Sequence, residues 1–347
     1  MKKIISSLLQ YTIFLGLGIF LLWWTTKNLT DSEIQHLKDA LSDANYLLVI
    51  PAMILLLLSH YSRALRWKIL MEPLDIRPTS LNTFFAVMLG YFFNLLVPRL
   101  GEVMKCTILA RYEKTPVDKI IGTMVAERAI DFICLLIVIG LTVFLQFDIA
   151  SSFFSTEWQK AADKSAANPG NFGFLITFSA IAAGLLLIFW IMRRFAHISI
   201  IARIRSLFQG IWQGLTSVRY VKRKAAFILH TVFIWSMYLM SIRLGFYAME
   251  SVSHLQMIPS FTILSFGSIA MIITQGGIGA YQLAVQKTLT LYGISEVNGL
   301  AYGWLLWAVQ TLLVLVVGLI CLLLLPIFNR NKHESIQQDS VETDVTG

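Results

Sequence analysis

Long apolar segments alternate with short polar ones along most of the chain. Six segments reach the ~20 apolar residues that a membrane span needs, and they occupy residues 5–24, 46–68, 121–146, 172–192, 225–248 and 300–325. Two further apolar stretches, 82–111 and 259–292, are interrupted in the middle by residues that break a helix. The pattern predicts an all-α polytopic membrane protein with about six spanning helices and two broken helical hairpins.

Each hairpin breaks at a short run containing proline or glycine. The first break reads Asn94-Leu95-Leu96-Val97-Pro98-Arg99-Leu100-Gly101-Glu102, and the second reads Thr274-Gln275-Gly276-Gly277-Ile278-Gly279. Half-helices over 82–97 and 102–111 would be ~24 Å and ~15 Å long at 1.5 Å per residue. Both are short for a hydrocarbon core of ~30 Å. We therefore expect two re-entrant hairpins, with two short full crossings as the alternative.

Basic residues fall mostly on one side of the predicted topology. With the amino terminus inside, the inner segments hold 19 Lys and Arg, whereas the outer ones hold 4 together with 9 acids. This asymmetry indicates cytoplasmic termini, provided that each hairpin returns to the side it entered from. The units 46–146 and 225–325 then form an inverted repeat within one domain, residues 1–330.

Two polar segments flank this repeat. The loop 193–224 carries eight basic residues and no acid, with apolar residues at helical spacing. Such a segment is typical of an amphipathic helix on the anionic inner leaflet. The tail 331–347 is polar, and we expect it to be disordered.

The composition narrows the function classes. The chain is 56% hydrophobic and 14% charged, with a net charge of +8, but its basic residues cluster at span ends, which argues against nucleic acid. No metal-ligand spacing, phosphate-binding loop or nucleophile motif is present in the sequence. We expect no enzyme activity, no catalytic residue, no metal and no cofactor.

The two breaks supply the first candidate residues. Irregular backbone at membrane depth persists only in protein or beside a wet cavity, and a helix amino terminus there favours an anion. Arg99 adds a fixed positive charge, and either a substrate or Glu102 is its expected partner. Asn94, Gln275 and Gln282 add neutral hydrogen-bonding groups around the breaks.

A second charged set lies within the spans. Glu127, Arg128 and Asp131 share one helical face, as a structural clamp or as a cavity wall. Arg243 either faces a cavity or pairs with an acid of the first unit, whereas Arg63 and Arg66 are interpreted as snorkelling anchors. The candidate substrate-binding residues are Asn94, Arg99, Gly101, Glu102, Glu127, Arg128, Asp131, Arg243, Gln275, Gly276, Gly277, Gly279 and Gln282.

These motifs, taken in order, resemble the lysylphosphatidylglycerol synthase transmembrane (flippase-like) domain family. The resemblance is carried by Arg63-x-x-Arg66-Trp67, the Asn94 to Glu102 break, Glu127-Arg128-x-x-Asp131 and Gly276-Gly277-Ile278-Gly279, and it covers about residues 5–325. It implies an integral membrane protein that moves a lipid head group between leaflets.

The chain departs from the family pattern in two ways. Nothing after Pro326 is expected to form the soluble aminoacyl-transferase domain, so we expect no synthesis of lysylphosphatidylglycerol. Where many members have a proline before the glycine pair and an acid after it, this chain has Thr274-Gln275 and Gln282. These changes argue against a cationic aminoacylated substrate.

The sequence thus predicts a multi-pass translocase of the plasma (inner) membrane that moves a polar or anionic lipid head group. The expected partners are membrane lipids, an anionic phospholipid or a lipid-linked head group, and we allow for a homodimer. A lipid-modifying membrane enzyme, or its partner subunit, is one alternative. A non-transporting membrane scaffold is another.

Overall fold

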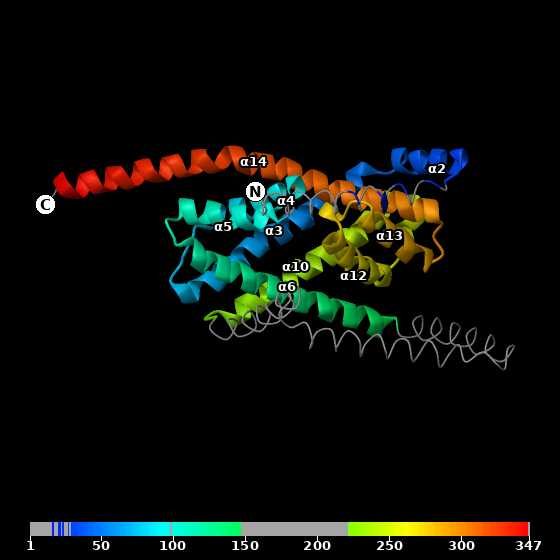
Figure 1. Cartoon of the computed structure of the whole chain (residues 1–347), viewed down its shortest axis with the longest axis horizontal. Helices are drawn as coiled ribbons and strands as arrows, with labels where there is room; N and C mark the ends of the chain where they lie inside the picture. The colour runs from blue at the N-terminus through cyan, green and yellow to red at the C-terminus, as the bar shows by residue number, and fades with distance from the viewer. Residues whose placement is uncertain are drawn as a thin grey trace, which may run out of the picture.

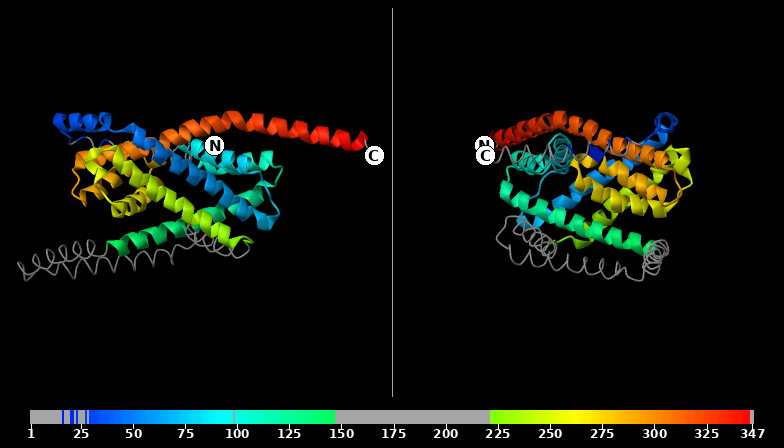
Figure 2. Two further views of the ribbon diagram at one scale, coloured as in Figure 1. Left: turned by 180° about the vertical axis from the view of Figure 1, so that it is seen from behind. Right: turned by 45° about the vertical axis from the view of Figure 1, so that its right-hand side comes forward.

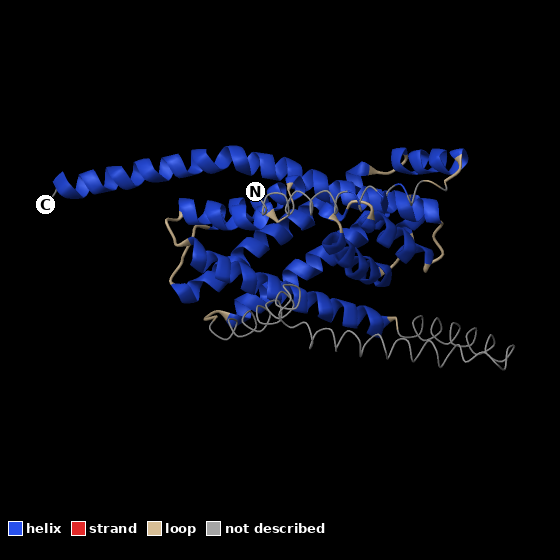
Figure 3. Cartoon of the chain, in the orientation of Figure 1, coloured by secondary structure: helices blue, strands red, loops and turns tan. Residues whose placement is uncertain are grey.

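The computed structural model describes residues 29–97, 99–146 and 221–345, with five isolated positions nearer the amino terminus, Gly16, Phe20, Leu21, Trp23 and Lys27. The predicted spans 172–192 and, apart from four of those positions, 5–24 lie outside the described residues. The same holds for residues 193–220 of the basic loop and for Pro98. Within the described part every regular element is a helix, as predicted (Figure 3).

Four helical stretches are long and apolar enough to cross a membrane. They are Tyr46–Leu74, Val117–Leu145, Lys224–Ala248 and Glu296–Arg330, and they contain α3 (Val49–Met71), α6 (Val117–Leu145), α10 (Lys224–Gly245) and the first part of α14 (Glu296–Val345). Four of the six predicted spans are thereby found where the sequence placed them. A shorter amphipathic helix, α2 (Asp31–Ser42), precedes them and begins with a capping box at Thr30 and Glu33.

Each predicted hairpin is a pair of short helices. The first consists of α4 (Ser80–Leu96) and α5 (Leu100–Tyr112), the second of α12 (Met257–Ile273) and α13 (Ala280–Thr290). Even the 17-residue α4 and α12 are only ~25 Å long.

Hydrogen bonds hold the two ends of each hairpin together. The Glu113 carboxylate after α5 accepts from the backbone N–H and hydroxyl of Thr79, at 3.0 and 2.7 Å. In the second hairpin, the hydroxyls of Thr262 and Tyr292 lie 2.7 Å apart. Each hairpin therefore returns to the end of the bundle at which it starts, which is the condition that the inverted repeat requires.

The packing of the two units is reciprocal. The long helices α3 and α10 pack against each other, α4 packs on α14, and α12 packs on α6. The colour gradient in Figures 1 and 2 shows that α3 and α10 run in opposite directions, as do α6 and α14. The hairpin tips approach each other, because α4 contacts the turn η4 (Gln275–Gly277) of the second break.

Glycine permits the close packing of the first hairpin. A Cβ added at Gly101 would lie 1.7 Å from the carbonyl oxygen of Gly90. Only a residue without a side chain lets α5 approach the backbone of α4 so closely. Gly101 therefore has a structural role at the break in addition to any role in binding.

The carboxyl-terminal tail differs from its prediction. Helix α14 continues without a break to Val345, so residues 331–345 are helical rather than disordered. The sequence has neither glycine nor proline between Pro326 and Val345, and those are the residues that most strongly end a helix. The polarity of this segment did not predict its secondary structure.

Candidate functional site

The first break sets Arg99 at the amino terminus of α5. Arg99 adopts a left-handed conformation with φ 63° and is the residue that precedes the helix. The Asn94 side-chain oxygen accepts from the backbone N–H of Gly101 at 2.8 Å, so the chain is tied across the turn. No carboxylate among the described residues pairs with Arg99, and Glu102 pairs with Arg128 instead, at 3.4 Å.

The second break contains no charged residue, and three of its glycines adopt positive φ. Gly276, Gly277 and Gly279 have φ of 60°, 75° and 75°, values that residues with a side chain rarely adopt. The indole N–H of Trp307 on α14 donates to the Gly276 carbonyl at 2.8 Å. The turn is therefore held to α14, the last helix of its own unit.

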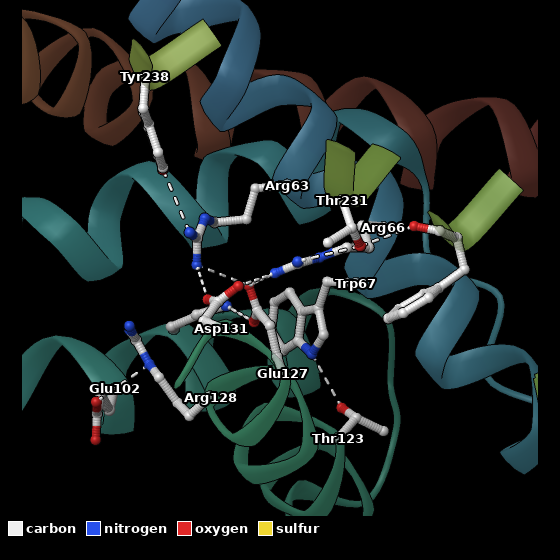
Figure 4. Close-up of polar contacts among 12 residues, drawn as sticks. Arg63, Arg66, Trp67, Glu102, Thr123, Glu127, Arg128, Asp131, Thr231 and Tyr238 are labelled. Carbon is white, nitrogen blue, oxygen red and sulfur yellow. Dashed lines mark hydrogen bonds and ion pairs between the residues drawn. The ribbon is translucent and has the colours of Figure 1, made fainter. Parts of the chain in front are cut away.

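A buried ion-pair cluster joins α3 to α6 (Figure 4). Both Arg63 and Arg66 donate to the Asp131 carboxylate, the latter at 2.6 Å. Arg63 also lies 3.4 Å from Glu127 and donates to the hydroxyl of Tyr238 on α10 at 3.3 Å. One carboxylate thus orients two guanidinium groups from adjacent turns of α3.

The same cluster reaches the first hairpin through α5. The Lys105 ammonium donates to Glu127 at 2.5 Å and lies 3.8 Å from the centre of the Trp67 ring. The Trp67 indole N–H in turn donates to Thr123 on α6 at 3.0 Å. These contacts fix the position of the first hairpin relative to α3 and α6.

The interpretation of Arg63 and Arg66 as snorkelling anchors is wrong. Their exposed fractions are 6% and 0%, and both guanidinium groups are paired within the protein. The sequence shows both residues near a span end, where snorkelling is common. It does not show that α6 brings Asp131 beside them, and this carboxylate is what retains them in the interior.

A cavity of about 670 Å³ lies between the two hairpins and the long helices. One part of its lining is polar and comes from both units. From the first unit it includes His60, Arg63, Tyr91, Asn94, Arg99, Glu102, Arg128 and Asp131, and from the second Tyr238, Ser241, Ser268, Thr274, Gln310 and Thr311. Another part is apolar and includes Leu135, Ile263, Leu264, Leu305, Leu306 and Val309. A cavity with both linings suits an amphipathic ligand better than a small polar one.

Comparison with known proteins assigns the chain to a family. Residues 8–332 match the family model described as the lysylphosphatidylglycerol synthase TM region. The chain belongs to the lysylphosphatidylglycerol synthase transmembrane family. No curated protein and no solved structure matches it. The family is a membrane domain associated with lipid modification and flipping, and the chain is a multi-pass membrane protein.

The cavity of this family member brings together about half of the candidate residues. Those that line it are Asn94, Arg99, Glu102, Arg128, Asp131 and Gly276. Glu127 lies behind the lining and is 1% exposed; it pairs with Arg63 of the lining and with Lys105, which lies outside it. The clamp and the cavity wall, which the sequence left as alternatives, are therefore both present in one motif.

The remaining candidates lie apart from the cavity. Arg243 donates to the Tyr247 hydroxyl at 2.8 Å and covers its ring, so it neither faces the cavity nor pairs with an acid of the first unit. Gln282 is fully buried on α13. Gly101, Gly277 and Gly279 shape the breaks, and of Gln275 the structure describes only the backbone.

Sequence reasoning missed several residues of the lining. His60 and Arg63 lie three apart on α3, and Tyr91 and Tyr238 complete the wall from α4 and α10. A signal for the first two existed, because polar residues three apart in an apolar span share a helical face. Nothing in the sequence indicated that the two tyrosines face the same space.

Proposed function

We propose that this protein is a lipid translocase that moves a polar or anionic head group between the leaflets. The observation that carries the proposal is the cavity between the two hairpins, whose lining includes both ionisable groups and many apolar side chains. A head group would occupy the polar part. The acyl chains would remain on apolar surface or in the surrounding lipid.

The charge balance of the site favours an anionic head group. The cavity lining and the side chains directly behind it include five cations and three carboxylates. The net charge of these eight groups is therefore +2. They are Arg63, Arg66, Arg99, Lys105 and Arg128 with Glu102, Glu127 and Asp131. Uncompensated charge at membrane depth is costly, and a phosphate would neutralise part of it.

Arg99 is the cation best placed to meet that phosphate. It lines the cavity, has no carboxylate partner among the described residues, and precedes the amino terminus of α5. A guanidinium can bind two phosphate oxygens at once, and the helix terminus adds a favourable dipole. These features support a binding role for Arg99.

A transport assay tests the proposal. The purified protein is placed in proteoliposomes with fluorescent phospholipids of anionic, zwitterionic and neutral head groups, and leaflet exposure is followed by quenching. We expect accelerated exchange for anionic lipids over protein-free vesicles. Exchange at the protein-free rate for every lipid would refute the translocase. Mass spectrometry of the same lipids would reveal a new product if the protein were instead a lipid-modifying enzyme.

The proposed location is the plasma membrane with both termini cytoplasmic, supported by the distribution of basic residues. Labelling of single cysteines tests the topology in a background in which Cys106, Cys134 and Cys321 are alanine. We expect Arg77→Cys and Asp118→Cys to be labelled from the inner side. His254→Cys and Ser295→Cys should be labelled from the outer side. Labelling of the first pair from opposite sides would refute the re-entrant arrangement.

A further inference from the structure

Three uncharged side chains of the cavity lining, His60, Trp235 and Thr274, have buried hydrogen-bonding atoms with no partner among the described residues, and of these only His60 and Thr274 can both donate and accept a hydrogen bond. His60 on α3 is 5% exposed, and neither of its ring nitrogens makes a hydrogen bond. Thr274, at the second break, is 4% exposed, and its hydroxyl is likewise unpaired. Buried polar groups in folded proteins are nearly always hydrogen-bonded to protein, water or a ligand, so each unpaired group beside the cavity is placed to bond a molecule inside it.

The ring of His60 is held in place although its nitrogens are free. Its centroid lies 4.9 Å from that of Tyr91 and 6.3 Å from that of Tyr238. Packing between two aromatic rings fixes the orientation of the imidazole without using its donor or acceptor. The nitrogens are thereby left for whatever occupies the cavity.

The carboxylates of the site are already engaged. Glu102 pairs with Arg128, Glu127 with Lys105, and Asp131 with Arg63 and Arg66. An ammonium group of a ligand would therefore have to displace an existing ion pair. The His60 imidazole and the Thr274 hydroxyl are unpaired, and each can donate a hydrogen bond to an uncharged hydroxyl and accept one from it.

We propose that His60 and Thr274 form a subsite for the hydroxyl groups of an anionic phosphodiester head group whose phosphate lies at the cations. The inference rests on the proposed function, because it assumes that a head group occupies the cavity. The substrate class is a phospholipid that carries a polyol on its phosphate. The two residues come from different repeat units, so the subsite exists only when both units are assembled.

A matched pair of lipids tests the subsite directly. Phosphatidylglycerol and phosphatidylpropanol have the same charge and nearly the same size, and only the former carries hydroxyls. Binding of each lipid to the detergent-solubilised protein is measured by native mass spectrometry. We expect the wild-type protein to prefer phosphatidylglycerol about 10-fold, the effect of one or two neutral hydrogen bonds.

Variants assign the preference to the two residues. His60→Phe and Thr274→Val should each lower it to about 3-fold or less, with binding of phosphatidylpropanol unchanged. The controls are His230→Phe and Thr142→Val, which remove groups that bond Ser62 and Ser265 and lie outside the cavity lining. Neither control should alter the preference.

The outcomes separate this inference from the proposed function. Equal binding of the two lipids to the wild-type protein would overturn the subsite, as would an undiminished preference in both folded variants. A selective binding that both variants abolish would support the subsite even if the proteoliposomes showed no transport. That result would refute the translocase alone.

Discussion

The two hairpins share a geometry but not a chemistry. Each is a pair of short helices that returns to the end of the bundle at which it starts, and the two tips approach each other at the cavity. The first break carries Arg99 and Glu102, whereas the second consists of glycines and uncharged residues. The two breaks therefore have a similar backbone arrangement, whereas the charged side chains belong to the first one.

The same asymmetry extends to the last helix of each unit, α6 and α14. In α6, Glu127, Arg128 and Asp131 form a charged face, but residues 300–325 of α14 contain no charged side chain. The first unit therefore supplies most of the electrostatics, and the second supplies apolar surface and a tightly turned backbone. A ligand between them would be bound by different forces at its two ends.

The largest effect is expected from Asp131→Asn in the charged unit. The carboxylate orients both Arg63 and Arg66, and its loss leaves Glu127 as the remaining acid near two buried guanidinium groups. Removing one partner from a buried ion pair costs about 3–5 kcal/mol. Thermal unfolding in detergent, followed by tryptophan fluorescence, measures the loss.

A second substitution sharpens this result. Adding Arg66→Leu to Asp131→Asn removes one of the two uncompensated charges and should recover part of the lost stability. If Asp131→Asn alone costs less than about 1 kcal/mol, the cluster is not a clamp.

A pair of alanine substitutions compares the two breaks themselves. In Gly101→Ala the new Cβ would lie 1.7 Å from the Gly90 carbonyl oxygen, so α4 and α5 must separate, at about 3 kcal/mol. In Gly276→Ala the nearest atom is a Leu95 methyl at 3.6 Å, so only the left-handed conformation costs free energy, about 1 kcal/mol.

The control for this pair is Gly122→Ala on α6, where a Cβ would meet nothing within 4 Å. Its effect should be neutral or slightly stabilising, because alanine is the better helix former. The same unfolding assay reports all three variants. Equal losses at Gly101 and Gly276 would show that the breaks are alike in packing, contrary to the structure.

Arg99→Gln should separate binding from stability. The side chain is exposed and has no ion pair among the described residues, so the unfolding temperature should remain within error. Transport of an anionic lipid should fall at least about 10-fold, the loss of one charge-assisted contact.

The matched control is Lys287→Gln in the second hairpin. Its ammonium forms an exposed pair with Glu296 at 2.6 Å and lies outside the cavity lining, so transport should not change. Full transport by a stable Arg99→Gln protein would exclude an anion site at the first break.

The smallest effect is expected from Glu102→Gln. Its pair with Arg128 is 3.4 Å long, and the two side chains are 36% and 40% exposed. Partly exposed pairs contribute less than about 1 kcal/mol, so stability should change little. A loss as large as that of Asp131→Asn would mean that the rim of the cavity is as tightly coupled as the buried cluster.

The sequence alone determined the helices, the two breaks and their flanking spans. Apolar length decides which segments lie in the membrane, and clustered glycine or proline residues mark the two breaks. Both properties are local, so the described spans and hairpins are found where they were predicted. The same rules identified Arg99, Glu102, Arg128 and Asp131 as ionisable groups at depth.

Only the tertiary structure decided which groups meet. Glu102 and Lys105 are neighbours on one turn of α5, yet each pairs with a residue of α6. Arg63 and Arg66 are internal because Asp131 approaches them from another helix, and His60 and Thr274 share a cavity although 214 positions separate them. Ion pairs and cavity walls depend on packing between segments distant in sequence, and the hydrophobic pattern of one helix does not encode its neighbours.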